Sequence, residues 1–195
     1  MNQPWRARHD APYVALIGAV EESDDAETIP VYMGFDGTYS HYPINAEPLV
    51  LLLSVGIEIS TLRAYLANIG VSPEPWLNDL TQSGAVVILG RGIQVDLSAL
   101  DGIGIIFIGE VSLTSTGVLE AQTVVGVDGE VNLSTNLVRL FVAAGTDSID
   151  SLIKRVCRDF DLNEEEIATE FIQSLPELLY CGVARLCYQA SGNSG

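Results

Sequence analysis

The chain has 195 residues, 48% of them hydrophobic, with nine basic residues against 26 acidic ones and a formal net charge of −17. This composition supplies enough apolar side chains for packed cores and excludes bulk disorder. The negative charge disfavours phosphate backbones as partners and favours basic or neutral ones. The longest mainly apolar run, Leu49–Val55, is far shorter than the roughly twenty residues of a membrane-spanning helix.

The amino-terminal residues indicate a cytoplasmic protein, and the cysteines show no metal or redox motif. Arg6 and Arg8 are followed only by an apolar run of strand length, which is not the pattern of a signal peptide. Cys157, Cys181 and Cys187 show neither CxxC nor metal-ligand spacing and have apolar neighbours. We expect buried, reduced thiols. The sequence therefore predicts a soluble protein with neither a metal nor a cofactor.

A sequence motif recurs along the chain at a nearly constant distance. Leu16–Val20 matches Phe107–Val111 at an offset of 91, and a Gly-x-Asp-Gly motif recurs at an offset of 92. Similar residue types follow in the same order in both segments. Because internal similarity at a fixed period is typical of a repeated structural unit, the sequence predicts two tandem copies, at 13–90 and 105–187.

Each copy is predicted to begin with three strands. Short β-rich runs are followed by an Asp-Gly dipeptide, at 36–37 and again at 128–129, that favours a tight hairpin turn. The predicted strands are Val14–Val20, Pro30–Phe35 and Thr38–Ile44 in the first copy, and Ile105–Val111, Ala121–Val127 and Glu130–Leu133 in the second.

Three helices and a final strand are predicted next in each copy. In the first copy the helices cover about Ala46–Val55, Ile59–Ile69 and Pro73–Ser83; in the second they begin at Thr135, Asp147 and Asn163, and the last is some seven residues longer. Gly56 and Gly145 are suited to left-handed helix ends. Asp147 is the expected cap of its helix, and Asn163 with Glu166 forms a capping box. The final strands are Ala85–Leu89 and Val183–Cys187.

The remaining segments are predicted to be tails and a linker. Residues 1–12 and 188–195 are expected to be disordered tails, and Gly90–Gly104 is expected to be a linker without an element of its own. The resulting fold class is α+β, with two copies of a β-β-β-α-α-α-β winged-helix-like unit.

Direct DNA recognition is disfavoured by the third helix of each copy, which a winged-helix protein would place in the major groove. These helices carry Glu74 and Asp79, or Glu164–Glu166, and lack basic residues. The only basic cluster lies on the helix before, where pairing with acidic neighbours is expected. The cluster is Lys154, Arg155 and Arg158, and its expected partners are Asp150, Asp159 and Asp161.

Catalytic motifs are weak as well. Gly102-Ile103-Gly104 is followed by an apolar strand, whereas a dinucleotide-binding loop requires a helix there. His41 is the only histidine outside the tails, and nothing near it resembles a nucleophile elbow. We therefore assign no catalytic residue and predict that the protein is not an enzyme.

The two copies resemble PqqD-like domains, the leader-peptide recognition elements of ribosomal peptide maturation. The pattern that carries the resemblance is Tyr32-Met33-Gly34-Phe35-Asp36, Ile44, Leu49, Leu52–Gly56, Ser60–Leu62, Trp76, Leu80 and Ser83–Val86, which is most similar to the copies that precede ThiF-like partners of azoline-forming cyclodehydratases. The second copy matches at Val125–Asp128, Leu137–Gly145, Ser148–Leu152 and Leu179–Val183. The resemblance covers about 29–89 and 121–187.

In that family a peptide adds a strand to the sheet, between the third strand and the third helix. The resemblance therefore implies a peptide-binding groove between Thr38–Ile44 and Pro73–Ser83. Its lining would be Tyr39, His41, Tyr42, Trp76 and Leu80. Strand addition suits a sheet edge because unpaired backbone groups give affinity and side-chain pockets give selectivity.

We therefore predict a non-catalytic module that binds a peptide or protein partner and that could form a homodimer. One alternative is an acidic winged-helix regulator of phage or chromosome-associated type, which acts through proteins or by mimicking DNA charge. Another is an enzyme whose site lies between the copies and holds a buried carboxylate or histidine with a perturbed pKa.

Overall fold

The computed structural model describes residues 11–21, 27–34, 38–90, 97–108, 110–112 and 121–189. Its class is α+β, with helices packed on several small antiparallel sheets. The predicted turn at Asp36-Gly37 lies outside the described residues, as do most of the predicted tails. The equivalent turn of the second half is present, and the Gly126 N–H donates to the Gly129 carbonyl across it.

The first half contains six short strands and three helices within the described residues. Two sheets form, with strand orders β5-β1-β6 and β2-β3-β4, and all pairs are antiparallel. A 3₁₀ turn at Ile44–Ala46 joins the last strand of the second sheet to the first helix. The elements are β1 (Tyr13–Leu16), β2 (Ala19–Val20), β3 (Thr28–Tyr32), β4 (Tyr39–Pro43), α1 (Glu47–Ser54), β5 (Ile57–Glu58), α2 (Ile59–Asn68), α3 (Pro73–Gln82) and β6 (Val86–Leu89).

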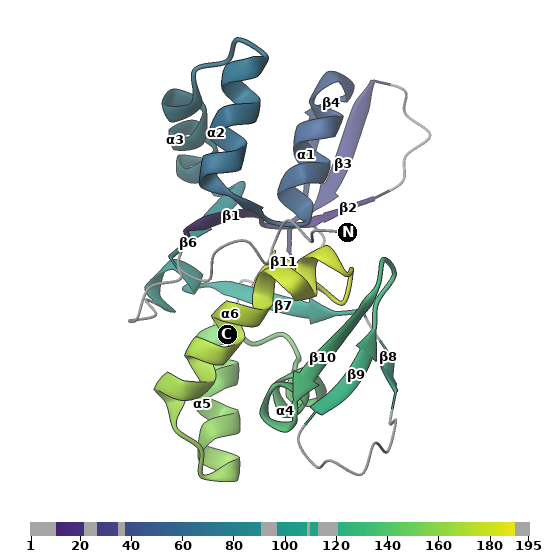
Figure 1. Ribbon diagram of the computed structural model, residues 1–195, viewed down its shortest axis with the longest axis vertical. Coiled ribbons are helices and arrows are strands. Elements are labelled where there is room, and N and C mark those ends of the chain that lie inside the picture. Colours follow the sequence, from purple (N-terminus) through teal and green to yellow (C-terminus); the bar gives the residue numbers. More distant parts are fainter. Residues whose placement is uncertain are drawn as a thin grey trace, which may run out of the picture.

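The second half has the same order of elements apart from β5. Its sheets are β11-β7 and β10-β9-β8, so its first and last strands pair as β1 and β6 do. The elements are β7 (Ile103–Phe107), β8 (Glu110–Ser112), β9 (Ala121–Val125), β10 (Glu130–Ser134), α4 (Thr135–Ala143), α5 (Ile149–Phe160), α6 (Glu164–Tyr180) and β11 (Ala184–Tyr188). Figure 1 shows the β1–β6 and β7–β11 pairs at the centre, with α1–α3 beyond one and α4 and α5 beyond the other.

The first predicted strand of each half is divided in two, which corrects the single runs Val14–Val20 and Ile105–Val111. Strand β1 pairs with β5 and β6, whereas β2 turns to pair with β3. The change of partner occurs at Gly18, whose φ is +139°. A Cβ there would lie 2.8 Å from the Tyr32 carbonyl oxygen. Only glycine fits this bend without strain.

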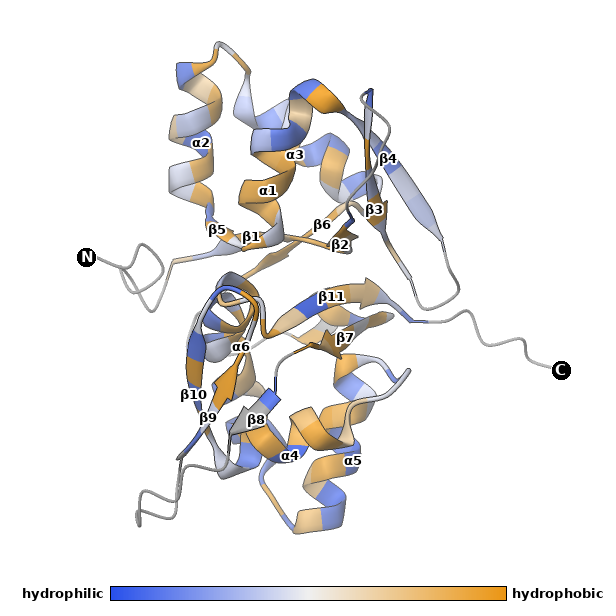
Figure 2. Ribbon diagram, turned by 90° about the vertical axis from the view of Figure 1, so that its right-hand side faces the viewer, coloured by the Kyte–Doolittle hydropathy of each residue, from blue (hydrophilic) through white to orange (hydrophobic). Residues whose placement is uncertain are grey.

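Strand β1 is buried on both faces because each half packs against one of them. Val14 and Leu16 belong to a core cluster formed within the first half. Tyr13, Ala15 and Ile17 point to the other side and belong to the core of the second half. The alternation follows from the two-residue period of a strand. Figure 2 shows the resulting hydrophobic colouring along the central strands.

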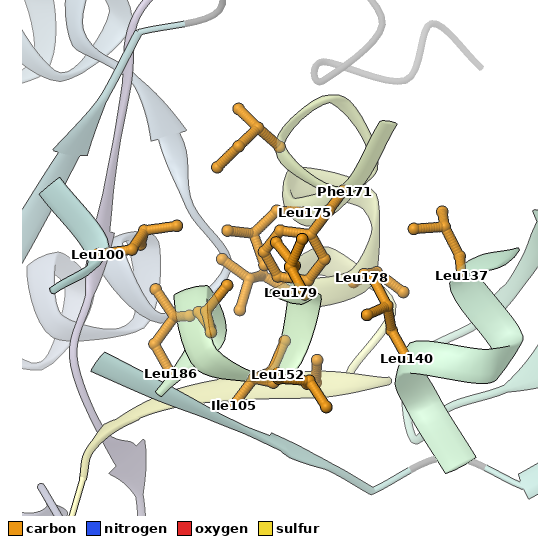
Figure 3. Close-up of a cluster of buried hydrophobic side chains, with 14 of the residues drawn as sticks. Leu100, Ile105, Leu137, Leu140, Leu152, Phe171, Leu175, Leu178, Leu179 and Leu186 are labelled. Atoms are coloured by element: carbon orange, nitrogen blue, oxygen red, sulfur yellow. The ribbon is translucent and has the colours of Figure 1, made fainter. Parts of the chain in front are cut away.

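The larger cluster is centred on α6 and extends across both halves. Phe171, Leu175 and Leu179 of this helix are at most 1% exposed. Around them gather side chains from α4, α5 and β11, together with Leu100 from the connecting segment (Figure 3). The two halves therefore share a hydrophobic core.

The helix ends confirm some predicted caps and correct others. The Asn163 side chain accepts the N–H groups of Glu165 and Glu166, as predicted for α6. Helix α5 is capped by Ser148 instead of Asp147, because the helix begins at Ile149 and Ser148 directly precedes it; Asp147 accepts a hydrogen bond from Arg155. Gly56 is left-handed, as predicted. Gly145 is not, because α4 ends at Ala143 and the following residue, Ala144, is already extended.

The predicted linker and carboxy-terminal tail both contain structure. Leu97–Leu100 forms a 3₁₀ helix with Leu100 fully buried, and β7 begins at Ile103. Tyr188 belongs to β11 and contacts the first half, so the tail begins later than predicted. These residues are ordered because they complete the shared core.

Candidate peptide-binding edge

Strand β4 is an edge strand of the β2-β3-β4 sheet. Within the described residues its only pairing partner is β3. Thr38 O accepts from Met33 N–H, and Ile44 N–H donates to Glu27 O. Because backbone groups of an antiparallel pair alternate in direction, the N–H groups of Tyr39 and His41 point away from β3. These are the groups that an added strand would bind.

Three of the predicted lining residues, one on β4 and two on α3, pack on the first-half core cluster. Tyr42 pairs with buried Ile29 and shares its face of the sheet. Tyr42, Trp76 and Leu80 are each half-buried and pack on the first-half core cluster. Burial raises the pKa of Tyr42, and the nearby Tyr188 raises it further. We call Tyr42, Trp76 and Leu80 the inner surface.

Tyr188 connects the segment after β3 with the end of α3, although the sequence prediction placed this residue in a tail. Its hydroxyl donates to the carbonyl of Gly84, just after α3, and its N–H donates to Met33 O at 2.6 Å. It also forms a parallel bridge with Gly34. Alternation with buried Leu186 could have suggested that β11 continues to Tyr188, but no local signal indicates its contact with the first half.

Tyr39 and His41, the other two predicted lining residues, do not belong to the inner surface. They pair with Tyr32 and Pro30, so they lie on the opposite face of the sheet from Tyr42. The Tyr39 ring meets the Tyr32 ring edge-on at 5.4 Å. Its hydroxyl donates to the Glu21 carboxylate at 3.1 Å, and this hydrogen bond is the main reason why the pKa of Tyr39 is raised.

In the second half the corresponding surface is closed. The inner residues of β10, Val131 and Leu133, are each 1% exposed. Ile167, the counterpart of Trp76, is 2% exposed, and Phe171 fills the position that Leu80 has in the first half. The sequence prediction of a shorter return strand is wrong, because β4 and β10 both have five residues.

The exposed face of α6 is acidic. A shallow depression of about 420 Å³ is lined by Asn163, Glu165, Glu166, Thr169, Glu170 and Gln173. The basic cluster on α5 is paired, as predicted, although one partner differs. Lys154 and Arg158 contact Asp150 and Asp159, whereas Arg155 contacts Asp147 instead of Asp161. The third helix of the second half therefore presents carboxylates where a phosphate-binding helix would present bases.

Other reactive groups are buried or absent from the part of the chain that the structure describes. The three cysteines are buried and unpaired with one another. Burial raises the pKa of the Cys187 thiol to about 12. Among the described residues, no group of His, Cys, Asp and Glu could hold a metal ion. No helix of the described segments is long and apolar enough to cross a membrane.

Comparison with known proteins gave no relatives. No protein-family model matches the chain, and neither a curated protein nor a solved structure is significantly similar to it.

Proposed function

We propose that this protein is a tandem winged-helix-like, PqqD-like module that captures an extended peptide on the free edge of β4. The bound segment would add a strand beside β4 and place alternate side chains on Tyr42, Trp76 and Leu80. Leader-peptide recognition in ribosomal peptide maturation is the role that this resemblance implies. In this proposal the first half binds the peptide and the second half serves as scaffold.

The observation that carries the proposal is the free edge of β4, which has one pairing partner among the described strands and carries the half-buried Tyr42. Edge strands with available backbone groups are templates for strand addition unless something covers or blocks them. Large aromatic side chains at the centre of an interface supply much of its binding energy. Here β4 has one partner among the described strands, and Trp76 is available beside the first-half core.

A proline substitution tests strand addition directly. In His41→Pro the backbone N–H on the free edge is removed, while the hydrogen bonds from β4 to β3 are kept; edge strands tolerate such a proline. Asn132 occupies the same position on β10, where its N–H also points away from the neighbouring strand. Asn132→Pro is therefore the matched control on the closed half.

The probe is a set of extended peptides selected against the full chain from a random display library. We expect His41→Pro to weaken their binding by about tenfold or more and Asn132→Pro to leave it unchanged, because one edge hydrogen bond and the register are lost. Circular dichroism and a thermal melt check that both variants fold. Equal binding by folded His41→Pro and the unmodified protein would refute the proposal.

Truncation of Trp76 separates binding from stability. Trp76→Ala should weaken peptide binding by about 2 kcal/mol or more if the ring is an interface anchor. Its exposed fraction predicts a smaller loss of stability than the about 3–5 kcal/mol of a fully buried tryptophan. A binding titration and a denaturant titration on the same sample measure the two effects.

A further inference from the structure

The last residue of β11 leaves the second half and is held by the first. The Tyr188 N–H donates to the Met33 carbonyl at 2.6 Å, and its backbone forms a parallel bridge with Gly34. Its hydroxyl donates to the carbonyl of Gly84, between α3 and β6. The ring packs against the core clusters of both halves. The first half therefore binds Tyr188 through its backbone, its ring and its hydroxyl.

The residues around Tyr188 fit a phenol closely. Gly84 has a φ of +71°, in the left-handed region that favours glycine. A Cβ at Gly84 would overlap the Tyr188 hydroxyl oxygen. Tyr42 packs on the first-half core cluster beside Tyr188, which raises the pKa of Tyr42. We call Met33, Gly34, Tyr42 and Gly84 the tyrosine site.

The second half closes the corresponding junction without an added side chain. Its hairpin turn lies directly on the turn after α6, because the Asp128 N–H donates to the Cys181 carbonyl at 3.1 Å. A Cβ on Gly126, the counterpart of Gly34, would overlap the same carbonyl. In the first half Tyr188 bridges the segment after β3 and the turn after α3. The first half thus accommodates an extra aromatic side chain at a junction that the second half closes directly.

Tyr188 is placed so that it can leave this site while most of β11 stays paired. It is the last residue of the strand, and Ala184–Cys187 pair with β7 before it. Its release would also break the hydrogen bond from Gln189 N–H to Gly102 O, at the end of the same ladder. Strand ends open at a small cost compared with global unfolding. The half-buried ring exposes less apolar surface on release than a core residue would.

We infer that the tyrosine site binds a tyrosine carried by an extended peptide, and that Tyr188 is its built-in, displaceable occupant. The partner's tyrosine would donate its N–H to Met33 O and its hydroxyl to Gly84 O. Because Tyr188 holds the same groups, the partner binds only when Tyr188 leaves, and its apparent affinity falls with the fraction of open sites. The second half thereby controls access to the first. The inference does not depend on strand addition at the free edge of β4.

A blocked pentapeptide, Thr-Thr-Tyr-Thr-Thr, tests the site, with Phe or Ala at its centre as comparisons. The full-length Tyr188→Ala protein should bind the Tyr peptide at least about tenfold more tightly than the unmodified protein, because the internal competitor is gone. The Phe peptide should bind about three- to tenfold more weakly than the Tyr peptide, because it lacks one hydrogen bond. Titration followed by the NMR signals of the peptide measures these weak affinities.

Two further substitutions locate the effect. Tyr180→Ala removes the partly exposed tyrosine at the end of α6, so the affinity should stay at the level of the unmodified protein. Gly84→Ala, combined with Tyr188→Ala, places a Cβ where the hydroxyl binds, so the preference for Tyr over Phe should disappear. Circular dichroism and thermal melts check that each variant folds. If Tyr188→Ala does not fold, Tyr188→Phe replaces it; this weaker occupant should raise the affinity for the Tyr peptide about three- to tenfold.

The remaining outcomes separate this site from the edge of β4. Equal affinity of the unmodified protein and the Tyr188 variants for the Tyr peptide would show that Tyr188 is not displaced, which overturns the inference. Equal binding of the Tyr, Phe and Ala peptides would show that the site does not recognise tyrosine. If His41→Pro abolishes binding of the Tyr peptide, the peptide lies on β4; the proposed function then stands and the tyrosine site is wrong.

Discussion

The two halves place the same elements around their third helices but bury them to different extents. Helix α3 has ten residues and buries only Leu77 completely, whereas α6 has seventeen and buries eight. The inner residues of β4 remain half-buried, and those of β10 are almost completely covered. The longer third helix therefore buries a larger apolar face, and the second half is more closed than the first. One half is left with a surface that can accept a ligand, while the other gains stability.

The largest expected effect compares two equivalent positions on these helices. Phe171→Ala should lower the free energy of unfolding by about 3–5 kcal/mol, because the ring is 1% exposed in the shared core. Leu80→Ala, at the matching position of α3, should cost less than about 2 kcal/mol, because this side chain is already half-exposed. Urea denaturation monitored by circular dichroism measures both. Equal losses would contradict the difference between an open and a closed half.

Local signals predicted the elements well because each element carries its own pattern. Pro73 and Asn163 correctly marked helix starts, and the Asp-Gly of the second half marked a turn. Contacts between distant segments left no such signal. Gly18 gave no sign that a single apolar run divides between two sheets, and Tyr188 gave none that it contacts Gly84.

The candidate site was predicted only in part, for a similar reason. Tyr42, Trp76 and Leu80 all pack on the first-half core cluster, and the groove that the resemblance implies between their two elements stays a prediction. Tyr39 and His41 were grouped with them although the alternation of β4 places them on the other face. The period of a strand determines which residues share a face, so this error could have been avoided from sequence. The Glu21 contact could not, because it joins separate strands.

Removal of the helix caps should give the next largest difference in stability loss between the halves. The Asn163 side chain accepts two backbone N–H groups at the start of α6, so Asn163→Ala should cost about 1 kcal/mol of stability. Ser72 caps α3 without a side-chain hydrogen bond, and Ser72→Ala should cost only a few tenths of a kcal/mol. Chemical denaturation of the two variants in parallel tests the contrast, which would be lost if Ser72→Ala were the more destabilising.

The contact between the halves can be tested at Tyr188. Tyr188→Phe removes the hydrogen bond to the Gly84 carbonyl and keeps the ring, so it should cost about 0.5–1.5 kcal/mol. Tyr39→Phe removes an exposed hydrogen bond to Glu21 and should cost less. Thermal melts of the Tyr188→Phe and Tyr39→Phe variants measure the two losses of stability. No change in the Tyr188→Phe protein would show that the hydroxyl hydrogen bond to Gly84 does not stabilise the contact between the halves.

Alkaline pH tests a buried thiol of the closed half. The pKa of Cys187 is raised to about 12 by burial, whereas the thiol ionises near pH 8.5 in the unfolded chain. The unfolded state therefore loses its proton first. The contribution of Cys187 to stability is complete below about pH 8.5 and is lost as the pH rises toward about 12.

Denaturation of the unmodified protein and of Cys187→Val at about pH 8 and about pH 10 measures this contribution. The variant should lose less stability over this interval, because it has no thiol to ionise. A parallel loss in the two proteins would indicate that Cys187 is accessible to solvent in the folded state. Burial also raises the pKa of Tyr188. The effect of Cys187 is therefore taken from the difference in stability loss between the two proteins.

The double burial of β1 affects the order in which the chain can fold during synthesis. Protein domains commonly fold as they leave the ribosome, amino-terminal domain first. Here Tyr13, Ala15 and Ile17 face side chains of the second half, and Met33 O receives its hydrogen bond from Tyr188 in β11. A nascent first half would therefore leave one side of β1 uncovered until β11 is synthesised. During that interval its hydrophobic strand could be protected only by a chaperone or by incomplete folding.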